Sequence, residues 1–162
     1  MDAATLTELG TRYDLAQLRA RLPRGIAAPV HAFDAAVVRA DGWRTSVVEA
    51  LRTATDRPWQ RVVFDAVETP AMRVLVDVVE CSSPDEALDE LLERLAGNQL
   101  AKLEEGPQGL GFAAFQHPPF APPAVFFARD NLCISVVSFG SRPVQVLTWA
   151  ERLVQALAKT PR

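Results

Sequence analysis

The alternation of apolar and polar residues is clearest at the end of the chain, over residues 124–159. Residues 125–127 and 132–137 are rich in β-branched and aromatic residues, which favour strands. The dipeptide Asp130-Asn131 lies between them, and both residue types tolerate the positive φ of a two-residue hairpin turn. One face of the second strand is fully apolar, and we expect it to face the core: Leu132, Ile134 and Val136.

An amphipathic helix is predicted to follow over residues 143–158. Gly140 ends the strand, Ser141 is a candidate N-cap, and Pro143 lies where a missing backbone N–H costs nothing. Trp149 borders the apolar side of this helix, and we expect it at the rim of the core. An exposed Trp149 would instead anchor a partner. The apolar stripe is Val146, Leu147, Ala150, Leu153, Val154 and Leu157.

A second helix is predicted over residues 84–96, and its start has the strongest local signals. Ser83 can cap the N-terminus, Pro84 suits the first helical position, and Glu86 completes a capping box. Gly97 provides a C-terminal stop. The face opposite the leucine stripe is acidic and is expected to be solvated, with an acidic docking surface as the alternative: Asp85, Asp89, Glu90 and Glu93.

The hydrophobic period changes to two over residues 60–67 and 72–81, which predicts two strands. A loop of turn length, residues 68–71, joins them, so we expect an antiparallel pair. One face of the pair is apolar, and the other carries Arg61, Asp65, Arg73 and Asp77. This alternation predicts a sheet with one covered side and one wetter side, with the N-terminal helices covering part of the latter.

The first part of the chain has weaker patterns. Residues 1–28 read as a weakly patterned arm, in which Asp14 can cap a short helix. Residues 30–40 have apolar positions at helical spacing, with a short strand as the alternative.

Another helix is predicted from the capping-box pair Ser46 and Glu49, and it should end before Pro58. Further extended segments are expected over residues 99–104 and 110–116. Between them, the glycines of residues 106–111 do not precede a helix, so we interpret them as a hairpin turn rather than a phosphate-binding loop.

These elements together predict an α+β fold. We expect a single antiparallel sheet of about five to six strands, helices 84–96 and 143–158 packed on it, and a helical N-terminal region. Residues 1–28 would form the arm and residues 29–162 a single domain. In element order alone, this is similar to small binding domains of the profilin-like, roadblock-type and type III secretion chaperone groups, and to photosystem-associated and Ran-binding domains.

Composition narrows the possible partners. The 162 residues are 49% hydrophobic and 23% charged, with a formal net charge of −3, and the basic residues are scattered among acids. We therefore expect neither nucleic acid nor a membrane as a partner. The sequence begins without the features of a signal peptide, which predicts a cytoplasmic protein; an exported protein whose signal has been removed is the alternative.

Two cysteines, Cys81 and Cys133, do not make a disulfide framework in a chain of this length. We interpret them as small buried thiols in a reducing compartment, with one bridge between them in an exported form as the alternative. A Cys133–His117 dyad is disfavoured because Cys133 lies within a predicted strand, where nothing stabilises a thiolate.

Candidates for catalysis are few. His31 and His117 lack the closely spaced partners of a metal site, so we expect no metal and no cofactor. Pairs of carboxylates could act as acid and base: Asp65 with Asp77, or Glu104 with Glu105. Because charge pairs across a sheet are commonplace, we regard the first pair as structural.

The segment HPPFAPP, residues 117–123, is stiff, extended and poor in backbone donors. A rigid loop is one interpretation; a contact surface with His117 and Phe120 as anchors, together with Trp149, is the other. The sequence thus favours a non-catalytic binding or adaptor domain that contacts a partner protein or a second copy. The alternative is a small-molecule or enzymatic pocket between the sheet and the N-terminal helices, using Asp65, Asp77 or His117.

Overall fold

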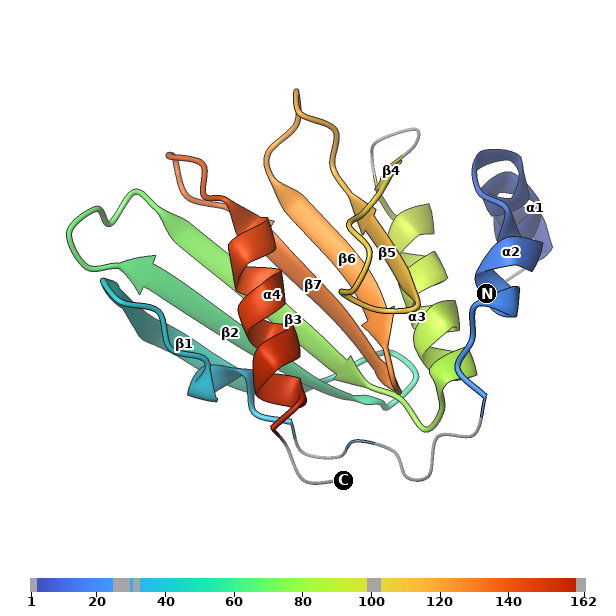
Figure 1. Cartoon of the computed structure of the whole chain (residues 1–162), viewed down its shortest axis with the longest axis horizontal. Helices are drawn as coiled ribbons and strands as arrows, with labels where there is room; N and C mark the ends of the chain where they lie inside the picture. The colour runs from blue at the N-terminus through green and yellow to red at the C-terminus, as the bar shows by residue number, and fades with distance from the viewer. Residues whose placement is uncertain (1–2, 25–29, 31–32, 99–102, 160–162) are drawn as a thin grey trace.

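The computed structural model describes residues 3–24, 30, 33–98 and 103–159. This part of the chain has one antiparallel sheet of seven strands in the order β1-β2-β3-β7-β6-β5-β4 (Figure 1). The strands are β1 (Trp43–Arg52), β2 (Pro58–Ala66), β3 (Arg73–Glu80), β4 (Glu104–Glu105), β5 (Ala113–Gln116), β6 (Ala124–Arg129) and β7 (Leu132–Ser138). The helices are α1 (Ala3–Arg12), α2 (Leu15–Ala20), α3 (Pro84–Ala96) and α4 (Val146–Leu157), with a 3-10 turn, η1, at Ala35–Val37. The predicted α+β fold with a single antiparallel sheet is confirmed, with slightly more strands than expected.

Helices cover both faces of the sheet, so the expectation of one covered side was wrong, although the N-terminal helices do lie on the expected wetter side. One core cluster joins α4 to Val76, Phe127 and Ile134. A second cluster joins α3 and the N-terminal helices to Val79 and Cys133, whose side chains point to the opposite face. In Figure 1, α4 accordingly lies in front of the sheet and α3 behind it.

Residues 43–52 form the edge strand β1, so the predicted helix from Ser46 was wrong. Ser46 and Glu49 do not form a capping box; the Ser46 hydroxyl donates to the carbonyl of Val63 on β2 at 3.3 Å. The strand pairs with β2 from Trp43 to Arg52, and its register shifts between Thr45 and Val47. The β-branched residues Thr45, Val47 and Val48 disfavour a helix here. The nine residue pairs with β2 stabilise the strand more than the helical spacing of this segment could stabilise a helix.

The predicted helix over residues 30–40 was also wrong: among the described residues of this stretch, only η1 is helical. The buried amide of Asn131 instead holds Val30, accepting from its N–H at 2.7 Å and donating to its carbonyl at 3.0 Å. The same amide donates to the carbonyl of Cys81 at 2.7 Å. Residues 25–29 and His31 lie outside the described residues.

The closing hairpin has the predicted two-residue turn, since Arg129 pairs with Leu132. Asp130 adopts positive φ (51°), the conformation that such a turn requires. The helix after the hairpin starts later than predicted, because α4 begins at Val146 with Gln145 as an N-cap that makes no side-chain bond. Ser141 therefore does not cap it, and Pro143 precedes it.

The predicted helix over residues 84–96 is confirmed in full as α3. The Ser83 hydroxyl accepts from the N–H of Glu86 at 3.2 Å, and Glu86 accepts from the N–H of Ser82 at 3.0 Å. Gly97 follows as the C-cap.

The N-terminal region is helical and packs on the α3 side. Asp14 caps α2 as predicted, accepting from the N–H of Gln17 at 2.9 Å. Leu9, Tyr13 and Leu18 are buried in the same cluster as α3. None of the helices in the described part of the chain combines the length and apolar character needed to span a bilayer.

Candidate functional site

A cleft of about 600 Å³ lies where the N-terminal helices meet the β4–β5 edge of the sheet. The elements around it come from three distant parts of the sequence: α1 and α2, the β4–β5 strands, and the proline-rich loop after β5. The described residues that line it are Arg12, Tyr13, Asp14, Gln17, Leu18, Leu103, Glu104, Glu105, Phe115, Pro118 and Phe120.

The floor of the cleft is apolar and rigid. Tyr13, Leu18, Leu103 and Phe115 are each no more than 8% exposed. The rings of Tyr13 and Phe115 meet edge to face with centroids 4.9 Å apart, the arrangement that aromatic pairs prefer. The Tyr13 hydroxyl accepts from the backbone N–H of Leu103 at 3.0 Å, which ties the N-terminal helices to the segment before β4.

The rim of the cleft is predominantly acidic. Asp14, Glu104 and Glu105 face a single arginine, Arg12, among the lining residues. Glu105 bonds Arg21 at 2.8 Å, and Glu104 accepts weakly from Gln116 at 3.4 Å. All three carboxylates are exposed, but Asp14 also caps α2 and Glu105 is paired with Arg21, so Glu104 is the least engaged of them.

Phe120 stands over the cleft on the predicted proline-rich loop and is 84% exposed. The loop is closed by two backbone bonds, from Ala121 to Pro118 at 3.0 Å and from His117 to Ala124 at 2.9 Å. Proline fixes φ and thereby limits the conformations of this loop. Phe120 lines the same cleft as the apolar floor, so its ring adds to a continuous apolar surface, which is a typical feature of an interaction site.

His117 lies beside the cleft without lining it, and its ring is held on both nitrogens. Nδ1 lies 2.8 Å from the carbonyl of Pro122, so this nitrogen carries the proton and donates. Nε2 is then an acceptor for the Asn98 amide at 3.2 Å. The imidazole also contacts the ring of Phe126 at 5.6 Å between centroids. These contacts make His117 a brace for the loop.

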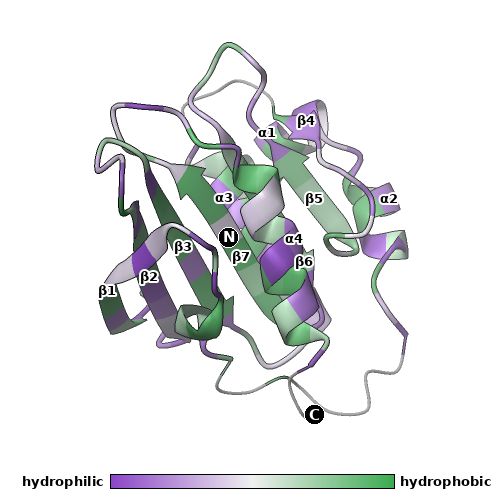
Figure 2. Cartoon of the chain, turned by 60° about the vertical axis from the view of Figure 1, so that its left-hand side comes forward, coloured by the Kyte–Doolittle hydropathy of each residue, from purple (hydrophilic) through white to green (hydrophobic). Residues whose placement is uncertain are grey.

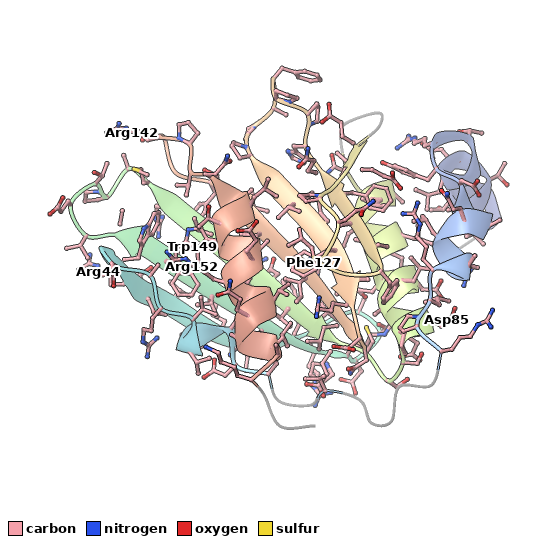
Figure 3. All side chains as sticks on the ribbon, viewed as in Figure 1. Arg44, Asp85, Phe127, Arg142, Trp149 and Arg152 are labelled. Atoms are coloured by element: carbon pink, nitrogen blue, oxygen red, sulfur yellow. The ribbon has the colours of Figure 1, made fainter. Side chains whose placement is uncertain are left out.

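Trp149 does not lie with His117 and Phe120. It is 3% exposed and extends from α4 toward the strands, with its ring centroid 4.5 Å from that of Phe64 and 5.1 Å from that of Trp43 (Figure 3). Expected at the rim of the core, it lies inside the core. A buried tryptophan cannot anchor a partner, so we leave it out of the candidate site.

Asp65 and Asp77 do not line the cleft, and both are ion-paired. Asp77 accepts from Arg61 Nε at 2.9 Å and from Trp59 Nε1 at 2.9 Å, while Asp65 accepts from Arg73 at 2.8 Å. Burial alone would raise the pKa of Asp65, but hydrogen bonds from Arg73 and Ser46 and the nearby arginine charges lower it. The lowered pKa keeps the Asp65 carboxyl charged near neutral pH, and the two ion pairs support the structural interpretation of both aspartates.

One residue of the predicted solvated acidic face of α3, Glu90, is buried, whereas Asp85 and Glu93 are exposed as expected. Glu90 is 7% exposed and accepts from Arg57 at 2.9 Å and from Arg94 at 3.4 Å. Arg94 in turn donates to the Ser135 hydroxyl on β7 at 3.1 Å. This network attaches α3 to the sheet, and both carboxylate oxygens of Glu90 accept from arginines.

Both cysteines are free thiols and are buried, so the alternative with a bridge is not what the structure has. Burial raises the pKa of Cys81 and of Cys133 to about 12 in each case. A thiol with such a pKa is a poor nucleophile. Among the described residues, no group of three His, Cys, Asp or Glu side chains could hold a metal ion.

Sequence reasoning found the loop and Phe120 but missed the floor of the cleft. Tyr13 and Leu18 belong to the weakly patterned arm, and Leu103 follows the undescribed residues 99–102, over which part of a strand was predicted. The sequence offered one clue to the floor: Tyr13, a large aromatic residue, directly precedes the helix that Asp14 caps. This clue suggested that Tyr13 is buried but did not indicate a partner. No family model matches the chain, and comparison with curated proteins and with solved structures gives no significant match.

Proposed function

We propose that the protein is a non-catalytic binding domain that receives a short segment of a partner protein in the cleft between α1–α2 and the β4–β5 edge. One observation carries this proposal: a cleft of about 600 Å³ with an apolar floor lies beneath Phe120, which is 84% exposed. Large aromatic residues at the centre of a contact typically supply most of its binding energy.

The floor and the rim favour different parts of the partner segment. Tyr13, Leu18, Leu103 and Phe115 offer an apolar surface for one large side chain. The carboxylates of Asp14, Glu104 and Glu105 favour a lysine or arginine beside it, because complementary charges speed encounter and select against acidic partners. The expected segment therefore has a large apolar residue next to a basic one.

Peptide selection with one variant that blocks the cleft and one control variant would test the proposal. Gln17→Trp places a large side chain in the cleft from an exposed position on α2, and Gln155→Trp makes the same change at an exposed position on α4. Peptides would be selected from a random displayed library on the wild-type protein, with depletion on Gln17→Trp. Their affinities would then be measured by calorimetry on all three proteins.

We expect selected peptides to bind the wild type and Gln155→Trp equally and to bind Gln17→Trp about tenfold more weakly or worse. Phe120→Ser should weaken the same peptides. Failure to recover any peptide that distinguishes wild type from Gln17→Trp would refute a peptide-binding cleft.

The second candidate is a small organic ligand in the same cleft. The volume of the cleft falls in the range of about 300–1,000 Å³ that is usual for small-molecule sites. A fragment screen by NMR separates the two candidates. Fragments that shift Tyr13 and Phe115 resonances while no peptide is selected would favour the small ligand.

A further inference from the structure

The two edges of the sheet are built differently, and β1 is the open one. Within the described residues, β1 pairs with β2 alone, so one side of its backbone faces outward from Arg44 to Arg52; the N–H of Trp43 donates to the Ala40 carbonyl at 3.1 Å. Seven of these ten residues are exposed. The opposite edge, β4, has only two residues and is flanked by the cleft and the N-terminal helices. Short, covered edges resist pairing with other chains, whereas long open ones favour it.

The strand β1 contains neither lysine nor proline, two residues that commonly block an edge. Its one irregularity is the shift between Thr45 and Val47, which makes Ser46 an extra residue relative to β2. This extra residue changes which side chains share a face. Trp43 and Thr45 lie on the α4 face with Val48 and Ala50, whereas the α3 face holds Arg44, Ser46, Val47, Glu49 and Leu51.

We infer that β1 pairs antiparallel with β1 of a second copy, about a two-fold axis between Ser46 and Val47. Residues directly opposite in an antiparallel pair must point to the same face. With the axis at this position, every pair from Trp43 to Ala50 meets that requirement. Every other register either places residues from opposite faces across from each other or matches fewer residues. The extra residue, Ser46, therefore selects the register with the axis between Ser46 and Val47.

Two rows of charge on the α3 face match across this axis. In one row, Arg44 lies opposite Asp65, and Asp65 lies opposite Arg73. In the other row, Glu49 lies opposite Arg61, and Arg61 lies opposite Asp77. Arg44 (labelled in Figure 3) and Glu49 end these rows at the outer edge, and both are exposed.

In the inferred register, Arg44 of each copy faces Glu49 of the other. Each row then continues into the partner as an unbroken alternation of positive and negative charge across six residues. Opposite charges directly across two strands stabilise their pairing, and like charges oppose it. An extended segment of unrelated sequence would not reproduce this match, which is why the occupant is a second copy.

Charge-swap variants test both the dimer and its register. The single variants Arg44→Glu and Glu49→Arg would each place two like-charged pairs at the interface, whereas the double variant R44E/E49R restores opposite charges. Glu151→Arg, at an exposed position on α4, makes the same change of charge away from β1. Sedimentation velocity would give the dimer dissociation constant of each protein, and circular dichroism would verify that each is folded.

We expect the wild-type chain of 17.7 kDa to sediment as a dimer, in equilibrium with monomer at low concentration. Each single variant should raise the dissociation constant about tenfold or more, the double variant should recover most of the loss, and Glu151→Arg should match the wild type. A wild-type monomer up to millimolar concentration would overturn the inference. A dimer that all the variants leave unchanged would overturn it too, because the contact would then lie on another surface.

Discussion

The two faces of the sheet are covered by helices of nearly equal length, 13 residues in α3 and 12 in α4, but the material beneath them differs. Under α4 the strands contribute valine, isoleucine and phenylalanine, and no charged residue is buried there among the described residues. Under α3 and beside it, Asp77 and Glu90 are buried with arginine partners. In Figure 2, hydrophilic bands cross β1, β2 and β3.

The difference follows from how far each helix reaches across the sheet. On the α4 face, η1 and its flanking residues extend the cover to β2, so the middle of the sheet can be fully apolar. On the other face, α3 contacts β3, β6 and β7, and the β1–β2 part is covered instead by paired arginine and aspartate side chains. Apolar packing should therefore dominate the stability of the α4 face, and hydrogen-bonded ion pairs should contribute to the stability of the α3 face.

The largest expected effect on stability comes from the face of the sheet that α4 covers. Trp149→Ala removes a ring that packs against Phe64 and Trp43, and we expect a loss of about 3–5 kcal/mol in the free energy of unfolding. Urea titration followed by circular dichroism measures this loss. Phe120→Ala is the matched control on an exposed ring, with an expected change within about 0.5 kcal/mol. Equal losses for the two variants would contradict the assignment of Trp149 to the core.

An intermediate effect is expected on the charged face. Asp77→Asn keeps an acceptor for Trp59 but removes the charge that binds Arg61 through two hydrogen bonds, so we expect a loss of about 1–3 kcal/mol. Asp56→Asn is the control, because Asp56 is exposed and asparagine tolerates its positive φ of 61°. An effect of Asp77→Asn as large as that of Trp149→Ala would abolish the contrast between the faces.

The smallest effect concerns acid stability at the start of α3. The backbone N–H of Ser82 and, after it, the Ser82 side chain lower the pKa of Glu86 below its ordinary value, burial opposes this shift, and the Arg57 charge adds to it. A carboxylate with a lowered folded-state pKa stabilises the fold above its unfolded-state pKa. That contribution disappears as the pH falls through the folded-state value.

Glu86→Gln should therefore destabilise the protein slightly at neutral pH, by a few tenths of a kcal/mol, and leave its stability at about pH 3 nearly unchanged. The effect is small because the Glu86 side chain is 43% exposed and water screens its interactions. Urea midpoints of both proteins at the two pH values measure the difference. If the urea midpoint of the variant fell by the same amount between neutral pH and about pH 3 as that of the wild type, Glu86 would not be a source of the acid sensitivity.

Much of the fold could be predicted from local sequence. The period of two placed β2 and β3, the Asp130-Asn131 turn placed the closing hairpin, and the Ser83 cap placed α3. In each case, the signal lies within a few residues of the element it specifies. The candidate site was predicted only in part, since Phe120 and its loop were identified while Tyr13, Leu18 and Leu103 were not.

By itself, the sequence determined most of the residues buried along α3 and α4, because an apolar stripe at helical spacing has no stable place in water. Glu90 and Trp149 are buried outside the predicted stripes. It did not determine which face of the sheet each stripe would cover, since both faces of β7 offer buried side chains. Only tertiary pairing decided that residues 43–52 form a strand, because the spacing of Ser46 and Glu49 suits a helix as well. The cleft likewise exists only once α1–α2 meet the β4–β5 edge, since contacts between distant segments leave no local pattern in the chain.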